Sequence, residues 1–157
     1  MGYEESDFME IAEQLRSDGY NCAQTVVCTF SSEMGLDREL LYRISEGFGS
    51  GMGGTYGTCG ALSGAIMVLS HLLSMGDPNM PSKQETYLWI EKLYETFTKD
   101  FGSPICREIK GLETNEKLYE CGDLIMETVR LTYRTIQEMG EYYEKLLLLH
   151  ADESSIR

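Results

Sequence analysis

The segment from Cys59 to about Met75 constrains the fold more than any other part of the chain. If it is wound as a helix, apolar side chains cover nearly all of its circumference instead of forming one stripe. A helix of this kind is buried on every side, so other helices must surround it. We therefore expect this segment at the centre of a helical bundle.

Further segments show apolar residues at helical spacing and end at glycine or proline signals. One of them, after the N-cap candidate Asn21, contains the β-branched run Thr25–Phe30, but the helical spacing on both sides favours a helix. Ser82 and Glu85 have the spacing of a capping box, and Ser103-Pro104 has the form of an N-cap followed by proline. In the helix that follows Ser82, one aromatic stripe should face the core: Tyr87, Ile90, Tyr94, Phe97 and Phe101. The predicted helices cover about residues 8–18, 21–34, 37–46, 59–75, 82–101, 103–110 and 122–150.

No linker or internal repeat divides the chain. The sequence thus predicts one all-α domain over residues 1–157, a bundle of about six or seven helices with a glycine-rich loop near residues 47–60. The polar tail, residues 151–157, should fray.

Charge and hydropathy exclude several classes of function. The 13 basic residues face 26 acidic ones, for a net charge of −13, and no basic cluster is present, so a nucleic-acid surface is excluded. No apolar run reaches the ~18 residues of a membrane span, and the N-terminus lacks the features of a signal peptide. We expect a cytoplasmic protein without membrane insertion, in which thiols stay reduced unless they take part in chemistry.

Four of the five cysteines lie where a helix is predicted to begin: Cys22, Cys59, Cys106 and Cys121. The N-terminus of a helix offers partial positive charge and free backbone N–H groups, which favour a thiolate and also suit a sulfur-ligated metal centre. Cys28 is different because it lies six residues after Cys22, about 240° round the same helix. We expect Cys28 to be a packing residue.

The glycine-rich loop allows two interpretations. Its G-x-G-x-x-G pattern follows no strand, which argues against a dinucleotide site. Dense glycines let a backbone approach either a neighbouring helix or a cofactor. The candidate cofactor-binding glycines are Gly49, Gly51, Gly60 and Gly64.

The element Cys59-Gly60-Ala61-Leu62-Ser63-Gly64, with one cysteine before it and two after it, resembles the C_GCAxxG_C_C family, which is described as redox-active. Here the first two letters of the family's name stand in the reverse order, Cys-Gly. Asn21-Cys22-Ala23-Gln24, the run Gly47–Gly49 and Cys106-Arg107-Glu108 share the likeness, which covers about residues 8–135. The resemblance implies that Cys22, Cys59, Cys106 and Cys121 are the functional cysteines. It also implies a similarity to the iron–sulfur-type domain of split-Soret cytochromes and, because family members are often encoded near transporter genes, a functional link to a transporter.

Three functions remain open. Four thiolates can hold a [2Fe–2S] cluster, or another iron or zinc centre. Alternatively, two thiols cycle between dithiol and disulfide with no metal, and Cys59 then attacks as the most exposed thiol of lowest pKa. Tyr56 and Arg107 are expected to tune or bind the centre, so the protein is either an oxidoreductase or an electron-transfer protein with an unidentified redox partner. The third function is a non-redox binding module with buried cysteines, in which the stripe on the last helix forms a homodimer.

Overall fold

A computed structural model describes the backbone of residues 2–154 and the side chains of residues 2–148. Within these residues the fold is all-α, as predicted, with six helices of at least seven residues and no strand. One isolated antiparallel bridge, between Thr58 and Ile105, is the closest approach to sheet structure in the described part. The helices are α1 Glu5–Ser17, α2 Cys22–Thr29, α3 Ser31–Met34, α4 Arg38–Ser45, α5 Gly49–Met52, α6 Gly60–Leu73, α7 Lys83–Phe101, α8 Cys106–Ile109 and α9 Cys121–Ser154, with a 3₁₀ turn η1 at Glu46–Phe48.

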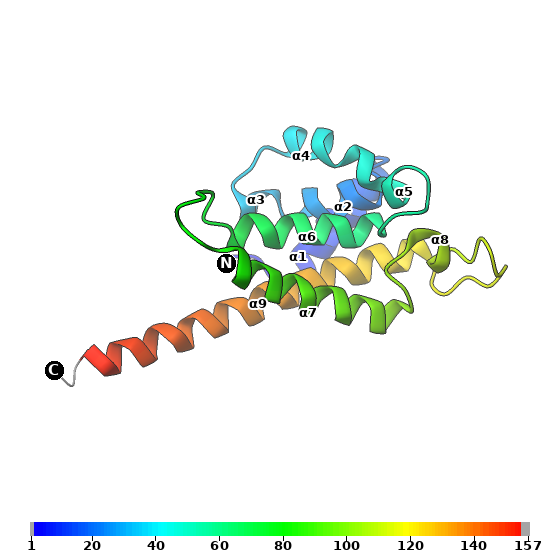
Figure 1. Cartoon of the computed structure of the whole chain (residues 1–157). Helices are drawn as coiled ribbons and strands as arrows, with labels where there is room; N and C mark the ends of the chain where they lie inside the picture. The colour runs from blue at the N-terminus through cyan, green and yellow to red at the C-terminus, as the bar shows by residue number, and fades with distance from the viewer. Residues whose placement is uncertain (1, 155–157) are drawn as a thin grey trace.

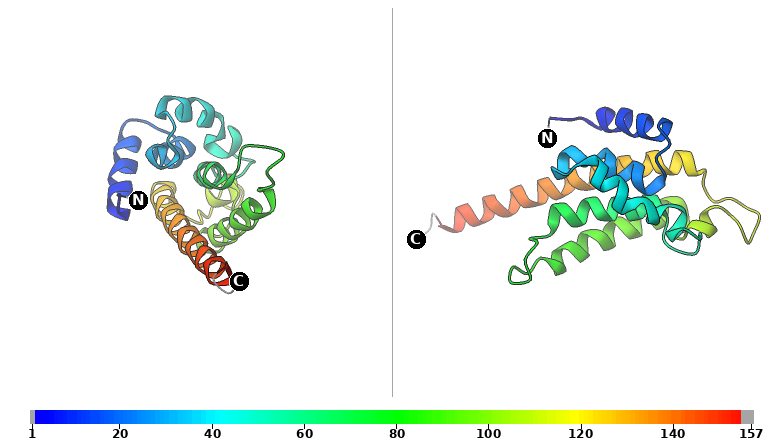
Figure 2. Two further views of the ribbon diagram at one scale, coloured as in Figure 1. Left: turned by 90° about the vertical axis from the view of Figure 1, so that its left-hand side faces the viewer. Right: turned by 90° about the horizontal axis from the view of Figure 1, so that it is seen from above.

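Helix α6 lies at the centre of the bundle, as its all-round apolar sequence predicts. It packs against α2, α7 and α9, which surround it in Figures 1 and 2. Its first ten residues are mostly buried, with Leu62, Val68 and Leu69 fully so, whereas Leu72 and Leu73 are only half-buried. The part of α6 nearest its N-terminus is therefore the most enclosed.

The β-branched run in α2 is helical, and Asn21 caps that helix. The side chain of Asn21 accepts a hydrogen bond from Gln24 N, and the Gln24 side chain accepts one from Asn21 N, both at 2.9 Å. The helix does not continue to Met34 as expected. It breaks at Phe30, whose backbone leaves helical geometry and whose ring stacks on Phe8 with the centroids 4.8 Å apart.

Two predicted helix starts are wrong in detail. Ser82 makes no side-chain cap for α7, because its hydroxyl accepts a hydrogen bond from Met75 N at 3.1 Å instead. The short helix after Pro104 begins only at Cys106, since Ser103 accepts from Ile105 N at 3.0 Å and closes a turn there. The predicted Gly102 stop is correct, with φ 88° at that residue.

The aromatic stripe on α7 is only partly correct. Phe97 and Phe101 are buried, whereas Ile90 and Tyr94 are half-buried and Tyr87 is 65% exposed. The buried positions nearer the helix start are Thr86 and Leu93. The buried face is therefore offset by one position at that end of the helix, which a list of aromatic residues does not reveal.

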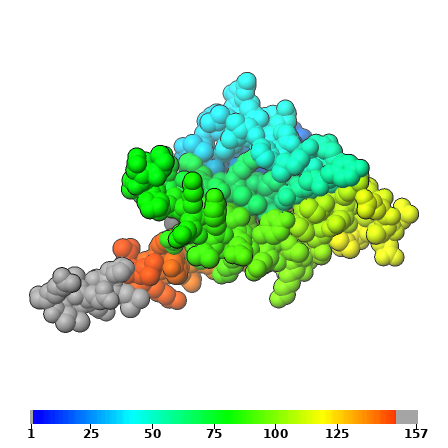
Figure 3. All heavy atoms as spheres, viewed as in Figure 1, coloured from blue at the N-terminus to red at the C-terminus, as the bar shows by residue number. Residues whose placement is uncertain are grey.

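Helix α9 is the longest element, and its C-terminal end extends past the rest of the molecule in Figure 1. The orange part of the helix already protrudes in Figure 3. It begins at Cys121, one residue earlier than expected. The tail predicted to fray continues as helix to Ser154, and the remainder of that tail lies outside the described residues. Among the described helices, none has the length and hydropathy needed to span a membrane.

Candidate functional site

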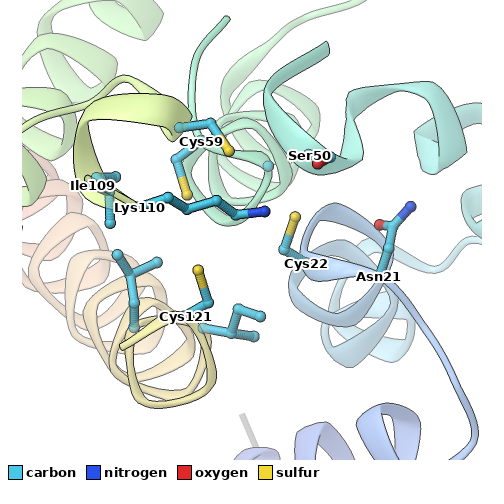
Figure 4. A pocket seen from close by; sticks show the side chains of 11 residues that line it. Asn21, Cys22, Ser50, Cys59, Ile109, Lys110 and Cys121 are labelled. Atoms are coloured by element: carbon cyan, nitrogen blue, oxygen red, sulfur yellow. The ribbon is translucent and has the colours of Figure 1, made fainter. Parts of the chain in front are cut away.

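Four cysteines from four helices line one cavity of about 190 Å³. In Figure 4 the side chains of Cys22, Cys59 and Cys121 converge on a common space, and that of Lys110 reaches into it. The fourth cysteine of the lining is Cys106. The rest of the wall consists of Asn21, Ser50, Gly60, Ile109, Lys110, Leu124 and Ile125.

The predicted helix-start positions of all four cysteines are confirmed. Cys22, Cys106 and Cys121 are the first residues of α2, α8 and α9, and Cys59 is the N-cap of α6. Four helix starts therefore meet at one cavity, and the longer helices α2, α6 and α9 place the positive ends of their backbone dipoles there. Cys28 lies elsewhere, fully buried in the core, with its sulfur 3.7 Å from the carbonyl oxygen of Arg38.

Backbone hydrogen bonds hold Cys59 and Cys106 beside each other. Cys59 N donates to Pro104 O at 2.7 Å, and Cys106 N donates to Gly57 O at 3.0 Å. Together with the Thr58–Ile105 bridge, these bonds tie the end of the glycine loop to the start of α8. The relative position of these two thiols is thus set by main chain and not by side-chain packing.

Cys22 is positioned by its neighbour Asn21 and by the absence of a side chain at Gly60. Besides capping α2, Asn21 donates from Nδ2 to Glu46 O at 3.0 Å, which anchors the helix start to η1. A methyl group at Gly60 would collide with the Cys22 sulfur and come within 3.0 Å of Phe48 O. Glycine at this position lets the start of α6 approach the thiol.

The glycine loop takes left-handed backbone conformations at residues that are not glycine. Ser50, Met52 and Thr55 have φ values of 55°, 62° and 68°. Such conformations cost about 1 kcal/mol or more each and concentrate at functional sites. Ser50 lines the cavity, and a side chain at Gly51 would collide with Cys106, so this loop packs closely against the thiols.

The predicted glycines have separate roles. Gly60 lines the cavity, while Gly51 and Gly49 leave room for Cys106 and Asn21, respectively, at its edge. Gly64 lies outside the lining, and a side chain there would come within 2.7 Å of Ala23 O on α2. Its part is close helix packing, which was the alternative interpretation of the glycines.

Arg107, expected to bind or tune the centre, also lies outside the cavity lining. Its guanidinium stacks on Tyr56 at 3.5 Å from the ring centroid and pairs with Glu113 at 3.0 Å. Tyr56 itself is 74% exposed. Arg107 N also donates to Thr55 O at 2.9 Å. Arg107 and Tyr56 therefore stabilise the outer side of the glycine loop.

Lys110 is a lining residue that was not predicted from the sequence, as are Ser50, Ile109 and Leu124. It follows Cys106 by four residues and so returns to the same side of a helical turn, whereas Arg107, one residue on, points about 100° away. This i, i+4 spacing is the signal that could have found it.

Burial opposes ionisation of two thiols of this cavity, Cys59 and Cys106. Cys59 is only 7% exposed, and burial raises its pKa to about 12, although N–H groups of Ala61 and Leu62 act in the opposite direction. Burial also raises the pKa of Cys106, while the nearby charge of Lys110 lowers it. The prediction that Cys59 is the most exposed thiol of lowest pKa is therefore wrong, because desolvation outweighs the helix N-terminus. Cys22 and Cys121 are the half-buried thiols.

All five cysteines are free thiols. Within residues 2–148, no three His, Cys, Asp or Glu side chains are gathered closely enough to hold a metal ion. The thiols thus surround a space instead of meeting at a point.

A family model described as "Putative redox-active protein (C_GCAxxG_C_C)" matches residues 20–135, which include all four cavity cysteines. The chain belongs to this family. The match agrees with the resemblance drawn from the cysteine pattern, and it makes this C_GCAxxG_C_C protein a member of a cysteine-rich family assigned to redox chemistry. Searches among curated proteins and solved structures gave no match.

Proposed function

We propose that Cys22, Cys59, Cys106 and Cys121 together hold a redox-active centre, and that this centre is a [2Fe–2S] cluster. The observation that carries the proposal is the meeting of four thiols, each at a helix N-terminus, on one cavity. Four cysteine thiolates are the usual ligand set of such a cluster. Free N–H groups at helix starts suit its sulfur atoms, which accept hydrogen bonds.

The width of the cavity favours a cluster over a single zinc ion. Zinc draws four ligands to about 2.3 Å from one point, so its thiols must nearly touch. Here the four thiols and seven other residues line about 190 Å³, somewhat more than the roughly 150 Å³ of an engineered protein cavity that holds a benzene molecule. A group of several atoms fills such a space better than one ion.

When bound, a [2Fe–2S] cluster supplies one-electron transfer. The chain's own residues hold and shield it. The main chain keeps Cys59 and Cys106 in place, and the apolar side chains of Ile109, Leu124 and Ile125 limit access of water. Cys22 and Cys121 are half-buried and are therefore the two cavity thiols that a partner can reach.

The partial exposure of Cys22 and Cys121 also favours a second candidate function, thiol–disulfide exchange without metal. In that reaction two thiols of this chain become a disulfide, and a disulfide of a partner protein becomes two thiols. Cys22 and Cys121 replace Cys59 as the attacking residues, because attack requires an accessible thiolate.

The test is anaerobic reconstitution with ferrous iron and sulfide, followed by iron and sulfide analysis. We expect the wild-type protein to bind iron and sulfide in equal amounts and to turn brown. Alanine at any of the four cavity cysteines should remove most of the bound iron, whereas the matched variant Cys28→Ala should retain it. Wild-type protein that stays colourless and free of iron contradicts the cluster, and mapping of disulfides after mild oxidation then tests the second candidate. If the five thiols neither bind metal nor form a disulfide, the non-redox binding module is the remaining function.

A further inference from the structure

The thiol cavity contains one charged side chain. Lys110 lines it, and no aspartate or glutamate does so. Lys92 and Lys117, by contrast, pair with Glu138 and Glu120. Lys110 is in none of the ion pairs formed within residues 2–148, although the chain has twice as many acidic residues as basic ones, 26 against 13.

An ammonium group at this position has electrostatic consequences. Lys110 is half-buried, and the remaining wall is formed mostly by thiols and apolar side chains. Charges interact more strongly there than in bulk water, because less solvent screens them. The N-termini of the longer helices α2, α6 and α9 add positive potential in the same place. Among the residues that line the cavity, the one formal charge is thus positive, in a protein of net charge −13.

We propose that Lys110 makes the cavity select negatively charged occupants and supplies the countercharge of the centre that the four cysteines hold. The second half of this inference rests on the proposed function. A four-thiolate iron–sulfur centre is anionic, and it becomes more so on reduction. Lys110 therefore stabilises the reduced form more than the oxidised form and raises the reduction potential. It acts as a positioning and tuning residue and not as a ligand.

The first experiment needs no metal. Thiols of the apo protein are alkylated with iodoacetate, which is anionic, or with iodoacetamide, which is neutral, and the rate at Cys22 and Cys121 is followed by peptide mass spectrometry. We compare the ratio of the iodoacetate rate to the iodoacetamide rate. Changes in thiolate fraction and burial cancel in this ratio, because both reagents attack the same thiolate. In Lys110→Gln this ratio should fall by roughly threefold or more, because the anionic reagent loses the attraction of one nearby positive charge.

Two variants control this measurement. Lys110→Arg keeps the charge and should retain the wild-type ratio. Lys99→Gln removes an exposed charge near the C-terminal end of α7, outside the cavity lining, and should leave the ratio unchanged. A ratio that is the same in Lys110→Gln and wild type overturns the proposal.

The second experiment separates this inference from the proposed function. The midpoint potential of the reconstituted centre is measured in the same variants, and Lys110→Gln should shift it to more negative values while Lys110→Arg restores it. If the wild-type protein binds the cluster and the midpoint potential is the same in Lys110→Gln, the tuning role is refuted and the proposed function stands. If the wild-type protein binds no iron, but the alkylation ratio still falls in Lys110→Gln, the cluster is refuted and anion selection by Lys110 is supported.

Discussion

Among the cysteines, position in a helix and degree of burial act against each other. Cys59 is an N-cap with two backbone N–H groups close to its sulfur, yet burial raises its pKa to about 12. Desolvation by itself can move the pKa of a buried group by several units, more than a helix terminus contributes. Position at a helix start therefore predicts where a thiol lies, but not its protonation state.

Cys28 offers a prediction about pH because it lies away from the cavity. Burial raises its pKa from 9.0 to about 11, so between these values the unfolded chain releases a proton that the folded chain retains. The stabilisation by this thiol is complete below pH 9.0 and is lost as pH rises towards about 11. At about pH 10 the loss should be about 1.4 kcal/mol. Urea unfolding at about pH 8 and pH 10 in reducing buffer should show a smaller pH effect in Cys28→Ala than in wild type, and equal effects would contradict this account.

At the scale of helices, the sequence predicted what depends on local order. The central position of α6 and the cap of α2 follow from apolar spacing and from Asn21, and both are correct. The break at Phe30 and the offset core face of α7 depend on neighbours distant in sequence, which periodicity does not contain. The same limit applies to the site. The four cysteines could be selected by their helix-start positions, but their meeting across gaps of 37, 47 and 15 residues is a tertiary result, and so is the presence of Lys110 among them.

The cap of α2 should serve both stability and the site. Replacing Asn21 by alanine removes the acceptor for Gln24 N and should cost about 1 kcal/mol. Asp37 caps α4 in the same way, accepting from Leu40 N at 3.0 Å, but lies outside the cavity lining. We therefore expect Asn21→Ala and Asp37→Ala to lower the free energy of unfolding similarly, and only Asn21→Ala to change the alkylation rate of Cys22. A change of the same size in both variants would mean that the cap does not position the thiol.

For the whole molecule, the two ends of α9 have different surroundings. Its first residue is a cavity cysteine, whereas its far end extends beyond the bundle (Figure 2). Along α9, Met139 is the last buried residue of the described side chains. Four residues further on, Tyr143 donates a hydrogen bond to Glu85 of α7 at 2.7 Å. The contacts that dock α9 thus end near Tyr143.

Two truncations test this division. A chain ending at Leu148 keeps Met139 and Tyr143. Its free energy of unfolding should be within about 1 kcal/mol of that of the full chain. A chain ending at Glu138 loses both and should be less stable by about 2–4 kcal/mol, mainly because of the buried methionine. Thermal unfolding and iron content measure both effects. Equal stability of the two truncated chains would show that docking of α9 ends earlier.

The origin of the cavity in four distant segments also has a consequence for synthesis of the protein. Cys22, Cys59 and Cys106 precede the fourth cavity cysteine, Cys121, which is the first residue of α9. A nascent chain that has left the ribosome as far as residue 120 presents only three of the four cavity thiols and has no α9 to close the wall. Translation of α9 therefore completes both the fold and the ligand set, and any centre must be inserted after most of the chain has been made.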